Sequence, residues 1–203
     1  MNPSKTSQLL SRLRKEADAT LTGFCKTTWQ RISGPGKDEV TLDGNGAFSG
    51  LELEPGKDIT LRCALELPEE INGVRIAGEP LIATLFTIYP TTVKWNGISL
   101  FDEGGVPVAS GPALFEILPS IQVGGNGELE FQVHISPNQT TPWINFRLTT
   151  PGLRAKFERL DIVWAQISLA DAVAVSPEDR HLVDQAAALF PRRRRTGYTR
   201  SFE

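Results

Sequence analysis

The chain has 203 residues, of which 40% are hydrophobic and 22% are charged, and its formal net charge at pH 7 is −3. This composition is that of a globular protein with a core, and it excludes a disordered or fibrous chain. The small negative charge excludes a general attraction to nucleic acid or to an anionic membrane surface, and no apolar run approaches the roughly 20 residues of a membrane span. Two cysteines and no apolar secretory segment near the N-terminus lead us to expect a cytoplasmic protein with free thiols.

The first predicted element is an amphipathic helix. Pro3 and Ser4 are typical of a helix start. Apolar residues then recur at three- and four-residue steps, and they share one face: Leu10, Leu13, Ala17, Leu21 and Phe24. The helix must bury this face either on its own domain or on a partner.

From residue 52 onward, apolar and polar residues alternate as they do in strands. The run 79–90 is apolar on both faces, which predicts a central strand of a two-layer structure. Further strands are predicted at 58–67, 91–95, 113–118, 127–135, 142–150 and 159–170. Because no helical crossover separates these strands, the pattern predicts a mainly β fold, an antiparallel β-sandwich with a helix at its N-terminus and a short helix at its C-terminus.

The C-terminal part begins with a second predicted helix. Ser176 is a helix cap, Pro177 suits the first helical position, and acidic residues fill the first turn. Four arginines, 192–195, follow without a core pattern or interleaved aromatic residues, which favours a solvated linker or a disordered end over a contact with phosphates. We therefore expect three parts: a helical segment at 1–30, the sandwich at 31–170, and a helix with an arginine-rich tail at 171–203. The last part is either a linker or the truncated start of a next domain.

The sequence contains no recognisable catalytic constellation. His134 and His181 have no companion at metal-ligand spacing, so we expect no metal and no cofactor in this chain. Glycoside hydrolysis needs two carboxylates held across a bond, and the neighbours Asp102 and Glu103 lie on a loop, where their side chains diverge.

Aromatic residues remain as candidates for ligand contact, because sugars stack on exposed aromatic rings. Trp95 shares its face with Val93, which favours a place in the core beside a hairpin turn at Asn96-Gly97. Trp143 follows a proline at a strand start and is the better candidate for exposure. The candidate contacts for a carbohydrate or a partner surface are Trp95, Asp102, Glu103 and Trp143. The pattern nevertheless favours core packing for Trp95 and core or inter-domain packing for Trp143.

The order of these pieces resembles a known arrangement. A leading helix with Trp29 after it precedes "VKWNG", the acidic loop "LFDEGG", "ILPSIQVGGNGELEFQVHI" and "FRLTTPGLRAKFERLDIVW". Together they resemble the galactose-binding-domain-like β-sandwich of jelly-roll type. More narrowly, residues 5–170 resemble the N-terminal non-catalytic region of bacterial-type family 38 alpha-mannosidases.

The resemblance implies an accessory role. Enzymes of this family are glycosidases that use a zinc ion and an aspartate nucleophile in a later domain, which opens with a His-x-His-x-Asp motif. This sequence has no such motif, so none of those residues maps onto it. The implied function is a β-sandwich module without catalytic residues that packs against a catalytic glycosidase domain or subunit and supports oligomerisation or the shape of the substrate cleft. The alternative is a stand-alone carbohydrate-binding module, with a mannose-containing carbohydrate as its ligand. Nucleic acid and membrane are not expected partners.

Overall fold

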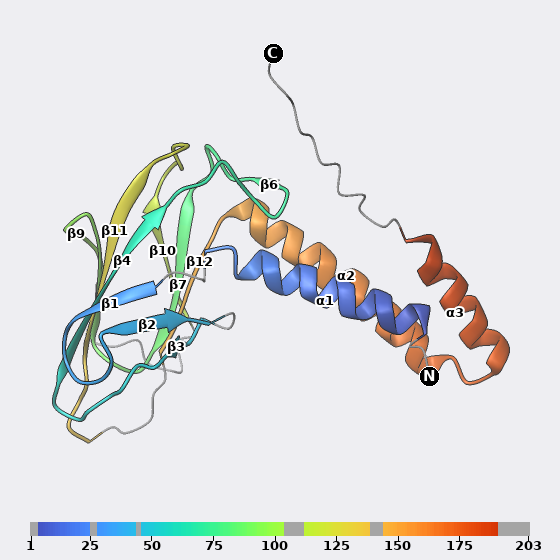
Figure 1. Cartoon of the computed structure of the whole chain (residues 1–203), viewed down its shortest axis with the longest axis horizontal. Helices are drawn as coiled ribbons and strands as arrows, with labels where there is room; N and C mark the ends of the chain where they lie inside the picture. The colour runs from blue at the N-terminus through green and yellow to red at the C-terminus, as the bar shows by residue number, and fades with distance from the viewer. Residues whose placement is uncertain (1–3, 25–27, 44–45, 104–111, 139–143, 191–203) are drawn as a thin grey trace, which may run out of the picture. The chain divides into compact units, whose positions relative to one another are not determined.

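The computed structural model describes residues 4–24, 28–43, 46–103, 112–138 and 144–190. The chain divides into two compact units, one formed by residues 16–159 and the other by residues 1–15 together with 160–203. The first unit holds the strands, and the second is helical (Figure 1). Among the described residues, no helix combines the length and the apolar character that a membrane crossing requires.

Every strand pairing in the first unit is antiparallel, which confirms the predicted fold class. The largest sheet has seven strands in the order β3-β2-β1-β4-β11-β8-β9, with bounds Phe48–Ser49, Glu39–Leu42, Thr28–Ser33, Asp58–Glu66, Asn126–His134, Thr91–Trp95 and Ile98–Glu103. A second sheet has the order β10-β7-β12, with bounds Ala113–Leu118, Leu81–Thr87 and Ile144–Thr149. A short ribbon pairs β5 (Glu70–Ile71) with β6 (Val74–Arg75). The run that is apolar on both faces forms β7, the central strand of its sheet, as predicted.

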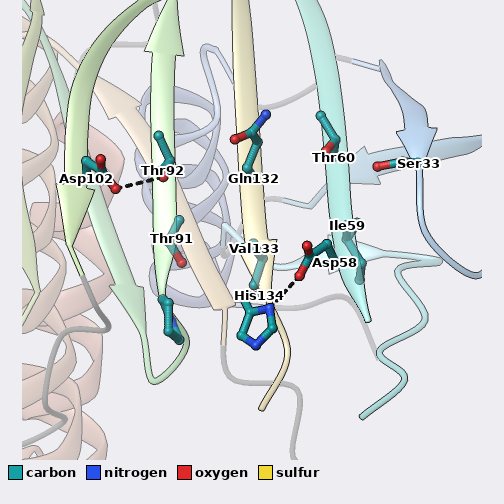
Figure 2. Close-up of a pocket in the computed structure, with 11 residues that line it drawn as sticks. Ser33, Asp58, Ile59, Thr60, Thr91, Thr92, Asp102, Gln132, Val133 and His134 are labelled. Atoms are coloured by element: carbon teal, nitrogen blue, oxygen red, sulfur yellow. Dashed lines mark hydrogen bonds and ion pairs between the residues drawn. The ribbon is translucent and has the colours of Figure 1, made fainter. Parts of the chain in front are cut away.

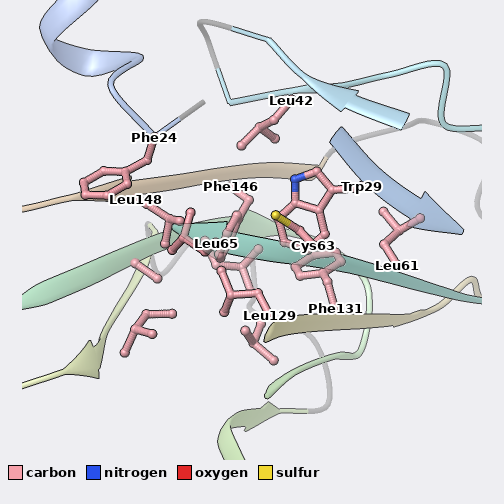
Figure 3. Close-up of a cluster of buried hydrophobic side chains, with 14 of the residues drawn as sticks. Phe24, Trp29, Leu42, Leu61, Cys63, Leu65, Leu129, Phe131, Phe146 and Leu148 are labelled. Carbon is pink, nitrogen blue, oxygen red and sulfur yellow. The ribbon is translucent and has the colours of Figure 1, made fainter. Parts of the chain in front are cut away.

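The core lies between the two larger sheets (Figure 1). Alternate residues of β4 and β11 point into it, so the period-two pattern of the sequence is also the pattern of burial. Trp29 is fully buried and packs edge-on against Phe131 of the same sheet and Phe146 of the other, with ring centroids 6.5 and 5.9 Å apart (Figure 3). These contacts join the two sheets through aromatic side chains.

The predicted hairpin turn after Trp95 is confirmed. Asn96 and Gly97 join β8 to β9, and both have positive φ angles, 49° and 80°. Positive φ at both central residues is the requirement of a two-residue type I′ turn, and asparagine followed by glycine is its preferred sequence. The Oδ1 atom of Asn96 also accepts a hydrogen bond from the backbone N–H of Glu128, at 2.8 Å, which ties the turn to β11.

The strand predicted at 159–170 is wrong: these residues belong to a helix, α2 (Pro151–Val173). Valine, isoleucine and tryptophan in this run favour a strand locally, but their spacing also fits a helix. The helix begins after Thr150, whose hydroxyl accepts a hydrogen bond from the backbone N–H of Leu153 at 3.4 Å, and Pro151 occupies its first position.

The other two helices lie where the sequence predicts them. In α1 (Lys5–Leu21) the buried residues are Thr6, Leu9, Leu13, Ala17 and Thr20, so the buried face is shifted from the predicted one, and Leu10 and Leu21 are only half-buried. In α3 (Pro177–Leu189) Ser176 accepts a hydrogen bond from the backbone N–H of Asp179, whose carboxylate in turn accepts one from Ser176, as in a capping box.

A small apolar cluster holds the helical unit together. Leu9 and Leu13 of α1 and Ala187 of α3 are buried in it, and four residues of α2 pack against them: Leu160, Val163, Trp164 and Ile167. The guanidinium of Arg14 lies 6.0 Å from the centroid of the Trp164 ring. The apolar face of the first helix is therefore buried within its own chain.

Candidate functional site

The four residues singled out from the sequence lie in different surroundings. Trp95 is 7% exposed and belongs to the core, in agreement with the packing interpretation. The loop predicted for Asp102 and Glu103 is wrong: Asp102 is exposed on strand β9, and Glu103 ends that strand. Trp143 lies outside the described residues. The ligand role proposed for these residues stays a prediction.

Asp102 takes part in a hollow of about 380 Å³ on the polar face of the seven-stranded sheet (Figure 2). Polar side chains from neighbouring strands line it: Ser33, Asp58, Thr60, Thr92, Gln132 and His134. A hollow of this size lies near the lower end of the roughly 300–1,000 Å³ that small-molecule sites occupy. Of the residues predicted from the sequence, Asp102 is the one that the structure brings to this hollow.

Five of these side chains form one row across five adjacent strands, which we call the polar row: Ser33, Thr60, Gln132, Thr92 and Asp102. Strand register places Ser33 opposite Thr60, Thr60 opposite Gln132, Gln132 opposite Thr92, and Thr92 opposite Asp102. The row lies on the face away from the core, because alternate residues of β4, β8 and β11 are the buried ones.

Part of the hydrogen-bonding capacity of the polar row is already used. The Thr92 hydroxyl donates to Asp102 Oδ1 at 3.0 Å, and the Gln132 side-chain amide donates to Glu130 Oε1 at 2.9 Å. The hydroxyls of Ser33 and Thr60 make no hydrogen bond to another residue that the structure describes. Hydrogen-bond donors and acceptors that no described residue engages therefore remain along the row.

A charged cluster lies beside the polar row. Glu130 accepts hydrogen bonds from Arg62 Nε at 2.7 Å and from Lys94 Nζ at 3.0 Å. Burial acts to raise the pKa of Glu130, but the hydrogen bonds and positive charges of Lys94 and Arg62 outweigh it, so that pKa lies below its ordinary value. The Arg62 guanidinium, hydrogen-bonded to Glu130 and close to Glu128, has a raised pKa. Glu130 is therefore held ionised as an acceptor, and a general acid would need the opposite shift.

The hollow has two exposed carboxylates, but they lie far apart. Asp58 pairs with the imidazole of His134 at 2.5 Å at one side, and Asp102 is on β9 at the other (Figure 2). Three strand intervals separate β4 from β9, or about 14 Å at the usual spacing of about 4.8 Å. Glycosidase carboxylate pairs lie only about 5–9.5 Å apart. Among the described residues, no group of three or more His, Cys, Asp or Glu side chains is placed to hold a metal ion.

A second hollow, of about 530 Å³, lies against the three-stranded sheet. Its lining includes Thr84 and the half-buried ring of Phe86 on β7, together with Asn145 and Arg147 on β12. It differs from the first hollow in presenting an aromatic side chain.

No protein-family model matches this sequence, and no curated protein matches it. Solved structures with local similarity include a family 31 alpha-xylosidase from Xanthomonas citri, 12% identical with a TM-score of 0.33, where the match covers 65% of this chain and 14% of that one. A beta-glucosidase from Kluyveromyces marxianus in complex with glucose is 11% identical with a TM-score of 0.38, covering 73% and 17%. The CBM36-1 domain of a multidomain xylanase from the hindgut metagenome of Trinervitermes trinervoides is 13% identical with a TM-score of 0.29, covering 60% and 90%.

These neighbours are glycoside hydrolases and a carbohydrate-binding module, and none of the three is a family 38 alpha-mannosidase. The chain spans less than a fifth of the length of the two enzymes.

Sequence reasoning missed the polar row, although a signal for it was present. Thr60 and Gln132 stand on the polar side of strands whose alternation was recognised. Their alignment with Ser33, Thr92 and Asp102 depends on register between strands far apart in the chain, which alternation within one strand does not specify.

Proposed function

We propose that this chain is a non-catalytic accessory module of a glycoside hydrolase and that it docks on a catalytic domain through its helical unit. One observation carries the docking: large apolar side chains of α2 and α3 remain exposed to solvent. On α2, Ile162, Leu169 and Val173 are 57%, 65% and 64% exposed. On α3, Leu182 and Leu189 are 62% and 85% exposed.

The exposed residues of α2 form a stripe. Ile162, Leu169 and Val173 are spaced by seven and four residues, which places them on one side of the helix. Val163 and Ile167, which pack against the apolar cluster of α1 and α3 residues, lie on another side. A helix that is apolar on two sides needs a partner on each side, and this cluster covers only one of them. Leu182 and Leu189 repeat the seven-residue spacing on α3.

The choice of partner in this proposal rests on the sequence resemblance. Because the chain resembles the N-terminal region of bacterial-type family 38 alpha-mannosidases and lacks their His-x-His-x-Asp motif, the catalytic domain of such an enzyme is the partner that we propose. In this proposal the sandwich shapes the surroundings of an active site that it does not contain.

The test is complex formation in solution. The whole chain is mixed with the catalytic region of a bacterial-type family 38 alpha-mannosidase, and the mass is measured by size-exclusion chromatography with light scattering. The wild-type chain should form a complex, and Leu169→Asp should abolish it, because the new charge would be buried at the interface. Leu169→Met is the matched control and should bind like wild type, since it keeps an apolar side chain of similar volume.

Two results would contradict the proposal. One is a wild-type chain that does not associate with the catalytic region. The other is an unchanged complex with Leu169→Asp, once far-UV circular dichroism has shown that the variant is folded.

A further inference from the structure

We propose that the polar row binds a neutral oligosaccharide by hydrogen bonds, with the sugar chain running across the strands of the seven-stranded sheet. This inference is independent of the proposed docking, because the row lies within residues 16–159 and the exposed apolar stripe does not. It also differs from the stacking of a sugar on Trp95 considered from the sequence, since Trp95 is 7% exposed.

The first argument is geometric. The row crosses five strands in the order β1-β4-β11-β8-β9, so at about 4.8 Å per interval it extends about 19 Å. An extended ligand that lies along it meets a new polar side chain at each strand. The strands are fixed by their backbone ladders, so these groups are held in place before a ligand arrives.

The second argument concerns the chemistry of the row. Each sugar hydroxyl is both a donor and an acceptor, and so are the hydroxyls of Ser33 and Thr60, which have no partner among the described residues. Gln132 has its amide nitrogen engaged by Glu130, which orients the side chain and leaves its amide oxygen as an acceptor. Asp102 receives the Thr92 hydroxyl on Oδ1, so its other oxygen also remains as an acceptor.

The same hollow suits other classes of ligand less well. The carboxylates of Asp58 and Asp102 repel phosphates and other anions, and at about 14 Å apart they cannot share one cation. A peptide added as a strand would pair at the edge strand β9 and run along it, whereas the row crosses the strands and β4, β11 and β8 are interior.

The test is a titration of the whole chain with neutral trisaccharides of mannose, glucose, xylose and galactose. Binding is followed by calorimetry and by amide chemical shifts, because Trp29 and Trp95 are buried and Trp164 lies in the helical unit, so these tryptophans need not respond. We expect at least one trisaccharide to bind and to shift the amides of Thr60, Thr92 and Gln132.

Variants then locate the site. Thr60→Val and Gln132→Leu remove polar groups while keeping side-chain size, and together they should weaken binding at least tenfold. The matched control is Thr84→Val, the same substitution on β7 at the hollow beside Phe86, and it should leave the affinity unchanged.

Two outcomes would overturn the inference. One is that none of the four trisaccharides binds at a concentration of about 10 mM, because a dissociation constant above that value is too weak for useful recognition. The other is binding that survives the double variant but is lost in Thr84→Val, which would assign the sugar to the second hollow. Neither outcome bears on the docking test with Leu169→Asp, so the two proposals fail separately.

Discussion

The indole ring of Trp95 on β8 lies directly against the backbone of Gly127 on β11. A Cβ atom at position 127 would stand 2.0 Å from Cζ2 and 2.3 Å from Cη2 of the ring, far inside any normal contact. Glycine in a strand interior often marks such a close approach, and an aromatic ring over a strand glycine covers the backbone that the missing side chain would leave bare. The burial of Trp95 therefore depends on a residue 32 positions later in the sequence.

Gly127→Ala should destabilise the protein by about 1–3 kcal/mol, the usual cost of overpacking, because the new methyl group displaces the ring of Trp95. Urea unfolding measures this change. The side chain of Trp95→Phe lacks the two ring atoms nearest to position 127. The double variant Gly127→Ala with Trp95→Phe should therefore lose less stability than the two single variants lose in total. Strictly additive effects would show that the ring and the glycine are not coupled.

Glu130→Gln should reduce stability at pH 7 by about 1 kcal/mol, because Arg62 and Lys94 lose their charged acceptor. The pKa of Glu130 in the folded protein lies below the ordinary value of a glutamate. The contribution of its charge to stability is therefore present above that ordinary value and is lost as the pH falls through the folded pKa. The stability difference between wild type and variant should therefore shrink between pH 7 and pH 3. It is measured by urea unfolding at both values.

Glu128→Gln is the control for this pH dependence. Glu128 lies 3.6 Å from Arg62 and its side chain is 54% exposed, so its charge is screened by solvent. We expect little change at either pH. If Glu128→Gln and Glu130→Gln behaved alike, the hydrogen-bonded geometry at Glu130 would not be the cause.

Asp184→Asn should loosen α3 in the helical unit. Asp184 Oδ1 accepts hydrogen bonds from the backbone N–H and the hydroxyl of Thr6 in the first turn of α1, at 2.9 and 2.5 Å. The Thr6 hydroxyl is the largest cause of the lowered pKa of Asp184, followed by the backbone N–H. The loss of the anion at a helix N-terminus should make the amides of α3 exchange several-fold faster with deuterium.

Asp171→Asn removes the same charge from the same part of the helical unit and serves as the control. The side chain of Asp171 makes no hydrogen bond or ion pair with another described residue, so exchange in α3 should stay at the wild-type rate. Equal acceleration in both variants would point to net charge and not to the contact with Thr6.

Asn96→Val at the β8–β9 turn should reduce the stability of the protein more than Asn96→Gly does. The φ of 49° at position 96 is strained for a β-branched residue and free for glycine. Both variants lose the hydrogen bond to the Glu128 N–H, so the difference between them isolates the backbone conformation. Thermal unfolding should place the melting temperature of Asn96→Val below that of Asn96→Gly, and equal values would contradict the turn geometry.

The helix 151–173 shows where sequence patterns stop being sufficient. The residues around Trp164 are β-branched and aromatic, and they satisfy a strand pattern as well as a helical one. Two features favour the helix over the strand. One is the helix start at Thr150 and Pro151, and the other is the packing of Val163 and Ile167 against the apolar cluster of the helical unit. Local propensity differs by only tenths of a kcal/mol per residue, so tertiary packing overrides it.

Alternation of apolar residues and the turn chemistry at Asn96-Gly97 determined the antiparallel strands, because side-chain direction and positive φ are local properties of the chain. The cap at Ser176 determined the start of α3 in the same way. Only the tertiary structure decided that Trp95 lies on Gly127 and that Ser33, Thr60, Gln132, Thr92 and Asp102 share one row. Those relationships depend on register between strands that are distant in sequence, and register is fixed by how all the strands bury their apolar faces together.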